Sequence, residues 1–411
     1  MTSSSSFVIV GGGLAAAKAV EVLRDKNFDG HITLFADEEQ LPYERPPLSK
    51  EYLAGKKTLV DFTVHDSDWY RDRHVDLRLN TRVESLDIDA HTVTAADGAA
   101  VAYDKLLLAT GSASRRPSIP GSDAEGVHYL RSYADAVALN SILAEGVSLT
   151  IVGAGWIGLE VAASARQRGA DVTVVESAQQ PLLGALGAEV GQVFADLHRE
   201  HGVDLRLGAQ VNEISAQDDR VTGLTLADGS VVGADAVLVA VGAKPNIELA
   251  EQAGLELSDG GVRVDASLRT SDVDIYAVGD IAAADSPLFG TRIRTEHWAT
   301  ALKQPAVAVA GMLGESAEYD ELPYFFTDQY DLGMEYAGHA PSYERVVFRG
   351  DRAGREFVAF WLDGDSRVLA GMNVNVWDVL DDVKALIRSR TPVDPEGLAD
   401  PAIALDSSSG R

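Results

Sequence analysis

The chain has 411 residues and carries 35 Lys and Arg against 63 Asp and Glu, a formal net charge of −28. An acidic surface repels phosphate backbones and anionic lipid headgroups, so this charge excludes nucleic acid and membrane surfaces as partners. The sequence has no cysteine, which excludes disulfides, thiolate metal sites and iron–sulfur clusters held by this chain.

No basic stretch precedes an apolar run at the N-terminus, so we expect no signal peptide. The longest uncharged, largely apolar run, 146–159, is shorter than the roughly 18 residues of a membrane-spanning helix. With the absence of cysteine, these features predict a soluble, cytoplasmic protein.

The first predicted elements form a nucleotide-binding pattern. A strand at 8–10 leads through a glycine-rich turn into a helix from Leu14 to about Lys26, and a strand at 32–35 precedes Asp37. Glycines in such a turn let the backbone approach a pyrophosphate at the helix N-terminus, and the later carboxylate accepts hydrogen bonds from ribose hydroxyls. The small residues of the turn are Gly11, Gly13, Ala15 and Ala16.

The pattern recurs with a strand at 150–152, a helix from Trp156 to about Arg168, a strand at 172–175 and then Glu176. The residues of this second turn are Gly153, Gly155 and Gly158. Two complete copies predict two bound nucleotides and electron transfer between them.

Three further predicted strands end in small residues. Small residues allow the backbone to pass close to a cofactor. The strands 106–108 and 237–239 end in Ala109-Thr110-Gly111 and Ala240-Val241-Gly242, and a run from Ile275 ends in Gly279-Asp280. Beyond about residue 322, β-like runs precede a predicted helix at 376–388 and a loose tail from Thr391, which indicates an α+β domain. These runs are 334–337, 345–348, 356–362 and 368–372.

A proline-rich run from Leu41 to Lys50 lies between the two nucleotide-binding patterns. This run and the motifs described above resemble the FAD-dependent NADH:ferredoxin reductase family, the putidaredoxin reductase-like branch of the glutathione-reductase structural class. The resemblance covers about residues 7–373 and is most specific in the run that ends at Lys50. Disulfide reductases of this class carry a redox-active cysteine pair after the first nucleotide motif, where this chain has none, so a thiol relay is excluded. The matching stretches are 41–50, 109–111, 153–160, 277–280, 296–298 and 323–330.

The resemblance implies an α/β fold with two Rossmann-like nucleotide-binding domains, for FAD and NAD, plus a C-terminal α+β domain. The implied boundaries are 1–110 for the first part of the FAD-binding domain, 111–239 for the NADH-binding domain, 240–322 for the second part of the FAD-binding domain, and 323–411 for the C-terminal domain with a flexible tail.

The resemblance also implies roles in FAD binding. Asp37 would bind the adenosine ribose, with Glu38 and Glu39 as nearby alternatives. Asp280 would bind the ribityl or pyrophosphate part of FAD, although it could cap the next helix. Arg131 would lie along the cofactor, with a surface salt bridge as the alternative, and Trp298 would cover one edge of the flavin ring, with an ordinary place in the hydrophobic core as the alternative. The full implied cofactor-binding set is Gly11, Gly13, Leu14, Ala15, Ala16, Asp37, Arg45, Lys50, Val83, Ala109, Thr110, Gly111, Arg131, Gly153, Gly155, Ile157, Gly158, Glu160, Glu176, Gly242, Gly279, Asp280, Glu296, His297 and Trp298.

Two residues, Lys50 and Glu160, are the implied catalytic pair. The family's lysine points at the flavin N5 region and pairs with a glutamate, and a cation there favours the anionic reduced flavin. Glu176 would accept from both ribose hydroxyls of the nicotinamide nucleotide and repel a 2′-phosphate, so we expect NADH rather than NADPH.

No metal site is expected. His198 and His201 are spaced i, i+3, but no third ligand follows at motif spacing, so we interpret them as surface histidines of a helix.

The function implied by the resemblance is hydride transfer from NADH to FAD, followed by single-electron transfer to an iron–sulfur ferredoxin. The ferredoxin would supply a haem monooxygenase or a ring-hydroxylating dioxygenase. Three alternatives stay open: an NADH:quinone or small-acceptor reductase, an oxidase, and a flavin-bearing interaction protein resembling apoptosis-inducing factor. The sequence indicates no oligomeric state.

Overall fold

The computed structural model describes residues 5–405, which divide into two compact units. Residues 1–4, on which part of the signal-peptide expectation rests, and 406–411, the end of the predicted tail, lie outside the described residues. The first unit consists of the chain up to Glu44, Leu59–Ala113 and Ala243–Pro323. The second unit consists of Arg45–Thr58, Ser114–Gly242 and the chain from Tyr324 on. These units do not test the boundaries expected for the FAD-binding and NADH-binding domains, which stay a prediction.

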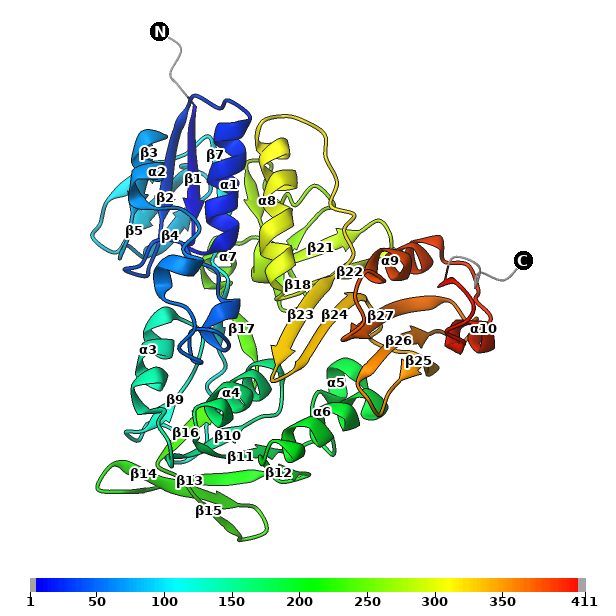
Figure 1. Ribbon diagram of the computed structural model, residues 1–411. Coiled ribbons are helices and arrows are strands. Elements are labelled where there is room, and N and C mark those ends of the chain that lie inside the picture. Colours follow the sequence, from blue (N-terminus) through cyan, green and yellow to red (C-terminus); the bar gives the residue numbers. More distant parts are fainter. Residues whose placement is uncertain (1–4, 406–411) are drawn as a thin grey trace. The chain divides into compact units, whose positions relative to one another are not determined.

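The first unit is built on a five-stranded parallel sheet with the order β20-β7-β1-β2-β3. Its strands β1, β2, β3 and β7 are labelled in Figure 1. Its central strands are almost fully buried, which explains why they read as continuous apolar runs. The small residues Ala16, Ala17 and Ala19 are fully buried in helix α1 (Leu14–Asp25), which packs against α8 (Trp298–Met312). The strands are β1 (Ser6–Val10), β2 (His31–Phe35), β3 (Val75–Arg78), β7 (Lys105–Leu108) and β20 (Ile275–Ala277).

Smaller elements complete this unit. Three antiparallel strands are β4 (Val83–Asp87), β5 (Thr92–Ala95) and β6 (Ala100–Ala102). A second sheet contains β18 (Leu257–Ser258), β19 (Gly261–Val264), β21 (Ala282–Ser286) and β22 (Thr291–Ile293). The short helices are α2 (Ser67–Asp72), α7 (Glu248–Gln252), η2 (Leu59–Phe62) and η3 (Gly279–Ile281), and a two-stranded ladder joins β8 (Ser112–Ser114) to β17 (Ala243–Pro245).

The second unit contains another five-stranded parallel sheet, with the order β12-β11-β10-β16-β9. Its first strand, helix and second strand follow each other as in the first unit. The strands are β9 (Val127–His128), β10 (Ser148–Val152), β11 (Asp171–Glu176), β12 (Asp204–Leu207) and β16 (Ala236–Val239). The remaining elements are η1 (Pro46–Leu48), α3 (Tyr133–Ile142), α4 (Trp156–Gln167), α5 (Leu183–Leu186), α6 (Ala188–Glu200), and an antiparallel sheet of β13 (Val211–Gln217), β14 (Arg220–Leu226) and β15 (Val231–Gly233).

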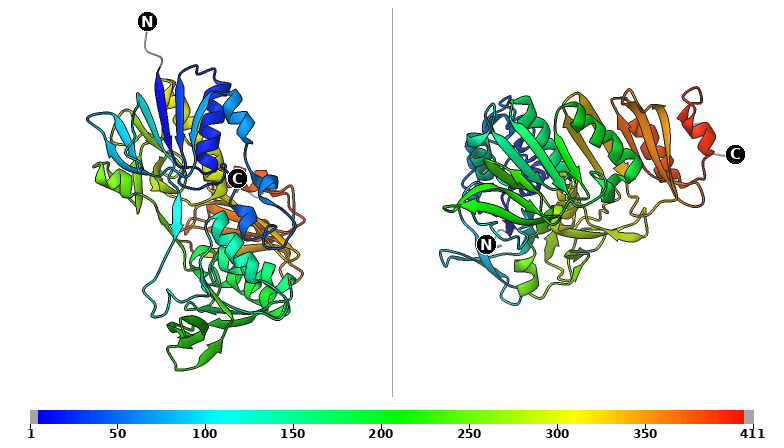
Figure 2. Two further views of the ribbon diagram at one scale, coloured as in Figure 1. Left: turned by 90° about the vertical axis from the view of Figure 1, so that its left-hand side faces the viewer. Right: turned by 90° about the horizontal axis from the view of Figure 1, so that it is seen from below.

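The C-terminal part of this unit is an antiparallel sheet with the order β23-β24-β27-β26-β25, drawn in orange in Figure 2. The α/β fold class with a C-terminal α+β part is therefore confirmed. Four strands of this sheet were predicted from the sequence, whereas the first strand, β23, was not. The elements are β23 (Tyr324–Gln329), β24 (Leu332–Gly338), β25 (Arg345–Asp351), β26 (Glu356–Leu362), β27 (Val368–Val374), α9 (Leu380–Ser389) and α10 (Pro395–Ala399).

One expectation about the C-terminal part is wrong. Helix α9 begins at Leu380 rather than 376, because Asn375 and Asp378 adopt positive φ and cannot belong to a right-handed helix. The described part of the predicted tail contains the helix α10, and the flexibility of the tail stays a prediction. The Asp394 carboxylate caps α10 by accepting from the backbone N–H groups of Glu396 and Gly397, and Leu398 is fully buried.

No helix in the range 5–405 is long and apolar enough to cross a membrane.

Candidate active site

The first glycine turn lies between β1 and α1. Gly11 has φ of +126°, and a Cβ built on it would lie 2.0 Å from the Ala109 carbonyl oxygen. Gly13 is the N-cap of α1, and no described atom lies within 4 Å of a Cβ built there. The first glycine is therefore required by the packing of the chain, whereas the second leaves open space at the helix N-terminus.

The second turn repeats this geometry between β10 and α4. Gly153 has φ of +105°, and its Cβ would lie 2.5 Å from the Ala240 carbonyl oxygen. Gly155 caps α4, with no described atom within 4 Å of a Cβ there, whereas a Cβ on Gly158 would lie 2.1 Å from the Gly153 oxygen. Both α1 and α4 have 12 residues and no acidic side chain in the first turn, so both N-termini fit a phosphate group.

The acidic residues that follow the two turns are placed differently. Glu176 ends β11, and its carboxylate accepts hydrogen bonds from the backbone N–H groups of Ala154 (2.7 Å) and Ala178 (2.8 Å). In the first copy the residue at the corresponding position is Ala36, because Phe35 pairs with Val10 as Val175 pairs with Val152.

Asp37 lies one residue later and is exposed, as is Glu39. The Glu38 carboxylate accepts a hydrogen bond from the Tyr43 hydroxyl at 2.6 Å. Asp37 and Glu39 are thus the more exposed of the three acids considered for the adenosine ribose, and the assignment of Asp37 to the ribose stays a prediction.

Gly279 and Asp280 lie beside the first turn. Gly279 has φ of +75°, and a Cβ built on it would lie 3.7 Å from the Cβ of Ala15 at the start of α1. Asp280 is buried within η3, and Arg294 donates to its backbone oxygen at 3.1 Å. The structure thus brings Gly279, the residue before Asp280, close to the start of α1, and the role of Asp280 in binding FAD stays a prediction.

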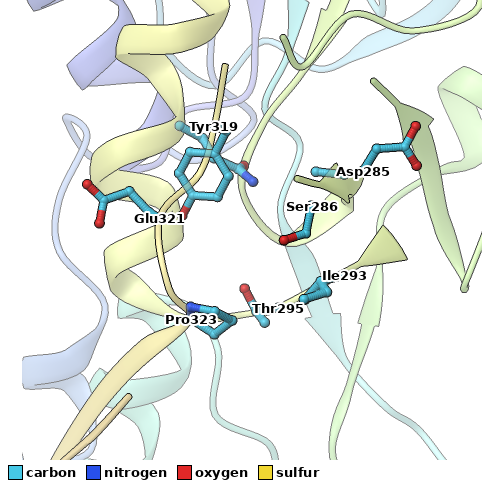
Figure 3. Close-up of a pocket in the computed structure, with 9 residues that line it drawn as sticks. Asp285, Ser286, Ile293, Thr295, Tyr319, Glu321 and Pro323 are labelled. Carbon is cyan, nitrogen blue, oxygen red and sulfur yellow. The ribbon is translucent and has the colours of Figure 1, made fainter. Parts of the chain in front are cut away.

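The next predicted stretch leads into α8. Glu296 accepts from Arg294 at 2.7 Å, His297 is the N-cap of α8, and Trp298 is its first residue. Both aromatic side chains are half-buried. Figure 3 shows a small pocket close by, lined by Ser286, Ile293, Thr295, Tyr319, Glu321 and neighbouring residues, but none of the predicted site residues lines it. Its carboxylates, Asp285 and Glu321, are ion-paired with Arg292 and Lys303.

Lys50 and Glu160 form a buried ion pair in the second unit. Their side chains are only 9% and 5% exposed, and Lys50 Nζ lies 3.4 Å from Glu160 Oε1. Thr327 donates to the same oxygen at 2.6 Å, and Ser49 donates to Oε2. Each ion is costly to remove from water, so these hydroxyls help to satisfy the carboxylate.

Neighbouring groups hold the backbone of Lys50 and contact its side chain. The 3₁₀ turn η1 precedes it, and Ser164 on α4 donates to the Ser49 carbonyl oxygen at 2.8 Å. Lys50 Nζ lies 5.2 Å from the ring centroid of Phe326. Burial raises the pKa of the neighbouring Asp328, while the charge of Lys50 acts in the opposite direction.

The predicted cofactor-binding residues are divided between the two units. Those in the first unit are Gly11, Gly13, Leu14, Ala15, Ala16, Asp37, Val83, Ala109, Thr110, Gly111, Gly279, Asp280, Glu296, His297 and Trp298. Those in the second are Arg45, Lys50, Arg131, Gly153, Gly155, Ile157, Gly158, Glu160, Glu176 and Gly242. Arg45 donates to the backbone oxygen of Arg131 at 2.6 Å, and Val83 is buried in the hydrophobic core of its unit.

The interpretation of His198 as a surface residue is wrong. Its side chain is fully buried, and Nε2 lies 2.8 Å from Gln329 Oε1. Burial lowers the pKa of His198 to about 4. The helical spacing to Val190 and Phe194, at i−8 and i−4, places His198 on the apolar face of α6 and could have indicated this. Within residues 5–405, no group of three or more His, Cys, Asp or Glu side chains is arranged to hold a metal ion.

Comparisons with known proteins match nearly the whole chain. A family model described as pyridine nucleotide-disulphide oxidoreductase matches residues 5–305, and one described as reductase C-terminal matches residues 324–408. The chain belongs to the pyridine nucleotide-disulphide oxidoreductase family.

Relatives of this oxidoreductase are similar over their full length. The chain is 40% identical over 403 residues to the ferredoxin--NAD(+) reductase component of the anthranilate 1,2-dioxygenase system of Burkholderia cepacia, covering 98% of this chain and 99% of the relative. It is 37% identical to putidaredoxin reductase of Pseudomonas putida, covering 98% and 97%. Among solved structures, the covalent putidaredoxin reductase–putidaredoxin complex matches with a TM-score of 0.95, 35% identity and full coverage of both chains.

The lowered pKa of His198 predicts an acid-sensitive fold. An unfolded histidine binds a proton below about pH 6.5, whereas folded His198 resists protonation until about pH 4, so its contribution to stability is present above pH 6.5 and is lost as the pH falls toward 4. We expect the wild-type free energy of unfolding to fall by about 2–3 kcal/mol more than that of His198→Gln between pH 7.5 and 4.5. Urea unfolding followed by tryptophan fluorescence measures both, and parallel pH curves would contradict the burial of a neutral His198.

Proposed function

We propose that this oxidoreductase is an NADH-dependent, FAD-containing ferredoxin reductase that passes electrons to an iron–sulfur ferredoxin. The observation that carries the proposal is the presence of two open glycine turns in a chain whose full-length relatives are named as ferredoxin reductase components. The structural relative in complex with putidaredoxin supports the same class of partner. The ferredoxin would in turn supply a haem monooxygenase or a ring-hydroxylating dioxygenase.

FAD is assigned to the first glycine turn. Bound FAD accepts a hydride from NADH and supplies electrons singly to a one-electron acceptor. Gly11 and Gly13 leave the N-terminus of α1 open to the pyrophosphate, Asp37 accepts from the adenosine ribose, and Asp280 binds the polar chain next to the turn.

NADH is assigned to the second turn. Gly155 leaves the N-terminus of α4 open to the pyrophosphate, and Gly158 allows α4 to pack closely on the turn. Two backbone N–H groups hold Glu176 beside the turn. In this fold, the side chain at that position accepts hydrogen bonds from the ribose hydroxyls. A fixed carboxylate at that position repels a 2′-phosphate, which favours NADH over NADPH.

Lys50 and Glu160 are assigned to the reacting ends of the cofactors. The ammonium of Lys50 would stabilise the negative charge that builds up when electrons arrive, and the ion pair with Glu160 holds Lys50 in place. Because the chain has no cysteine, electrons leave without a thiol relay of its own. We also propose a cytoplasmic location, because NADH, the proposed electron donor, is generated there.

Glu176 is expected to determine the choice of nucleotide. Replacing it with alanine removes acceptors for the ribose hydroxyls, and losing a hydrogen bond to a charged group costs about 1.5–3 kcal/mol. Glu176→Ala should therefore lower kcat/KM for NADH by roughly 10- to 100-fold and change kcat/KM for NADPH much less. Steady-state kinetics with both nucleotides tests this, and equal efficiency of the wild type with NADH and NADPH would overturn the assignment.

The choice of acceptor is tested by stopped-flow spectroscopy. The holoenzyme is reduced with NADH without oxygen and then mixed with a [2Fe–2S] ferredoxin, a soluble quinone or aerated buffer. Fast reoxidation by the ferredoxin, with slow reoxidation by the other two, is the expected result. Rapid reoxidation by quinone or oxygen, with none by ferredoxins from oxygenase systems, would contradict the proposed function.

A further inference from the structure

A continuous chain of buried hydrogen bonds connects the active-site carboxylate to His198. It runs from Glu160 Oε1 to Thr327 Oγ1 (2.6 Å), from Thr327 Oγ1 to Gln329 Nε2 (3.3 Å), and from Gln329 Oε1 to His198 Nε2 (2.8 Å). Thr327 and His198 are fully buried and Gln329 is 1% exposed. All of these residues belong to the second unit.

The hydrogen bonds of this chain run in one direction. Glu160, paired with Lys50, is a carboxylate and can only accept, so Thr327 must donate its single hydroxyl proton to it. The Thr327 oxygen then accepts from the amide nitrogen of Gln329, whose oxygen accepts from His198. His198 must therefore carry its proton on Nε2, and every donor in the chain points toward Glu160.

The unprotonated nitrogen of His198 agrees with this direction. Nδ1 is buried and has no hydrogen-bond partner among the described residues, as suits a neutral Nε2–H tautomer. A proton on Nδ1 would have no acceptor there. Burial also lowers the pKa of His198, because the charged ring would be removed from water.

The position of the chain in the fold is unusual for polar groups. Side chains alternate along β23, so Thr327 and Gln329 share one face of the strand, whereas Phe326 and Asp328 lie on the other. A strand face buried in this way is normally filled by apolar residues, because buried polar groups cost free energy unless each is satisfied. A satisfied polar chain that ends on an active-site carboxylate indicates a role beyond packing.

We propose that Thr327, Gln329 and His198 are positioning residues that hold the Glu160 side chain with Oε1 directed at Lys50. The proposal rests on the proposed role of Lys50 and Glu160 at the reacting ends of the cofactors. None of the three residues needs to touch a cofactor. They act through Glu160, whose position determines that of the Lys50 ammonium.

Isosteric variants of the holoenzyme test this role. Thr327→Val removes the hydroxyl at constant shape, Thr327→Ser retains it, and Glu160→Gln provides the reference. Thr270→Val is the matched control, because Thr270 is a buried threonine whose hydroxyl bonds only to the backbone of Asp272 among the described residues. Each variant is examined for thermal stability, for the limiting rate of flavin reduction by NADH in stopped-flow, for the Kd of NADH, and for the flavin midpoint potential.

We expect Thr327→Val to lower the limiting reduction rate by roughly 10-fold with little change in the Kd of NADH, as expected for the loss of a hydrogen bond to a charged group. Its midpoint potential should shift in the same direction as that of Glu160→Gln. Thr327→Ser should restore both quantities, and Thr270→Val should match the wild type. If Glu160→Gln slows reduction and Thr327→Val does not, the positioning role is overturned while the proposed function stands. If Glu160→Gln has no effect, the role assigned to Lys50 and Glu160 is overturned together with the positioning role.

A second measurement needs no turnover. Two-bond ¹H–¹⁵N correlation spectra of the full chain with ¹⁵N-labelled histidine report the tautomer of each ring, and His198→Gln identifies the signal. The expected result is a neutral Nε2–H ring for His198 at pH 7. An Nδ1–H tautomer or a doubly protonated ring would overturn the direction of the hydrogen-bond chain.

Discussion

The buried ion pair between Lys50 and Glu160 is the interaction on which the active site depends. Isolated in the interior, either ion would cost several kcal/mol, so the pair persists only because other groups satisfy the carboxylate. Ser49 and Thr327 both donate to it. This requirement explains two local features that packing alone does not: the proline-rich 3₁₀ turn that presents Ser49 and Lys50, and a strand, β23, with polar residues on a buried face.

The two nucleotide turns share a constraint of their own. In each, the first glycine faces the carbonyl oxygen of the residue that follows a neighbouring parallel strand, Ala109 after β7 and Ala240 after β16. No side chain fits there, so both copies need glycine for the same reason. The copies differ at the end of the second strand, where the second has Glu176 and the first has Ala36, and this difference agrees with the assignment of different cofactors to the two turns.

Much of this architecture could be predicted from the sequence because the strands of parallel sheets are buried on both faces and read as continuous apolar runs. The contact between Lys50 and Glu160 was implied by the resemblance to the reductase family, and the structure contains it. Strand β23 was missed because its inward residues are Thr327 and Gln329, whose polarity conceals the burial. The burial of His198 was missed for the same reason. The start of α9 depends on the positive φ of Asp378, and the helical tail depends on the cap formed by Asp394; both are local conformations that composition does not reveal.

The central claim is that the charge of Lys50 acts on the flavin. The most direct test is the midpoint potential of bound FAD, measured by spectroelectrochemistry in the wild type and in Lys50→Met, which retains the length of the side chain and removes its charge. A nearby cation favours the reduced cofactor, so the account predicts a more negative potential in Lys50→Met. An unchanged potential in a variant that retains FAD and its fold would contradict the claim.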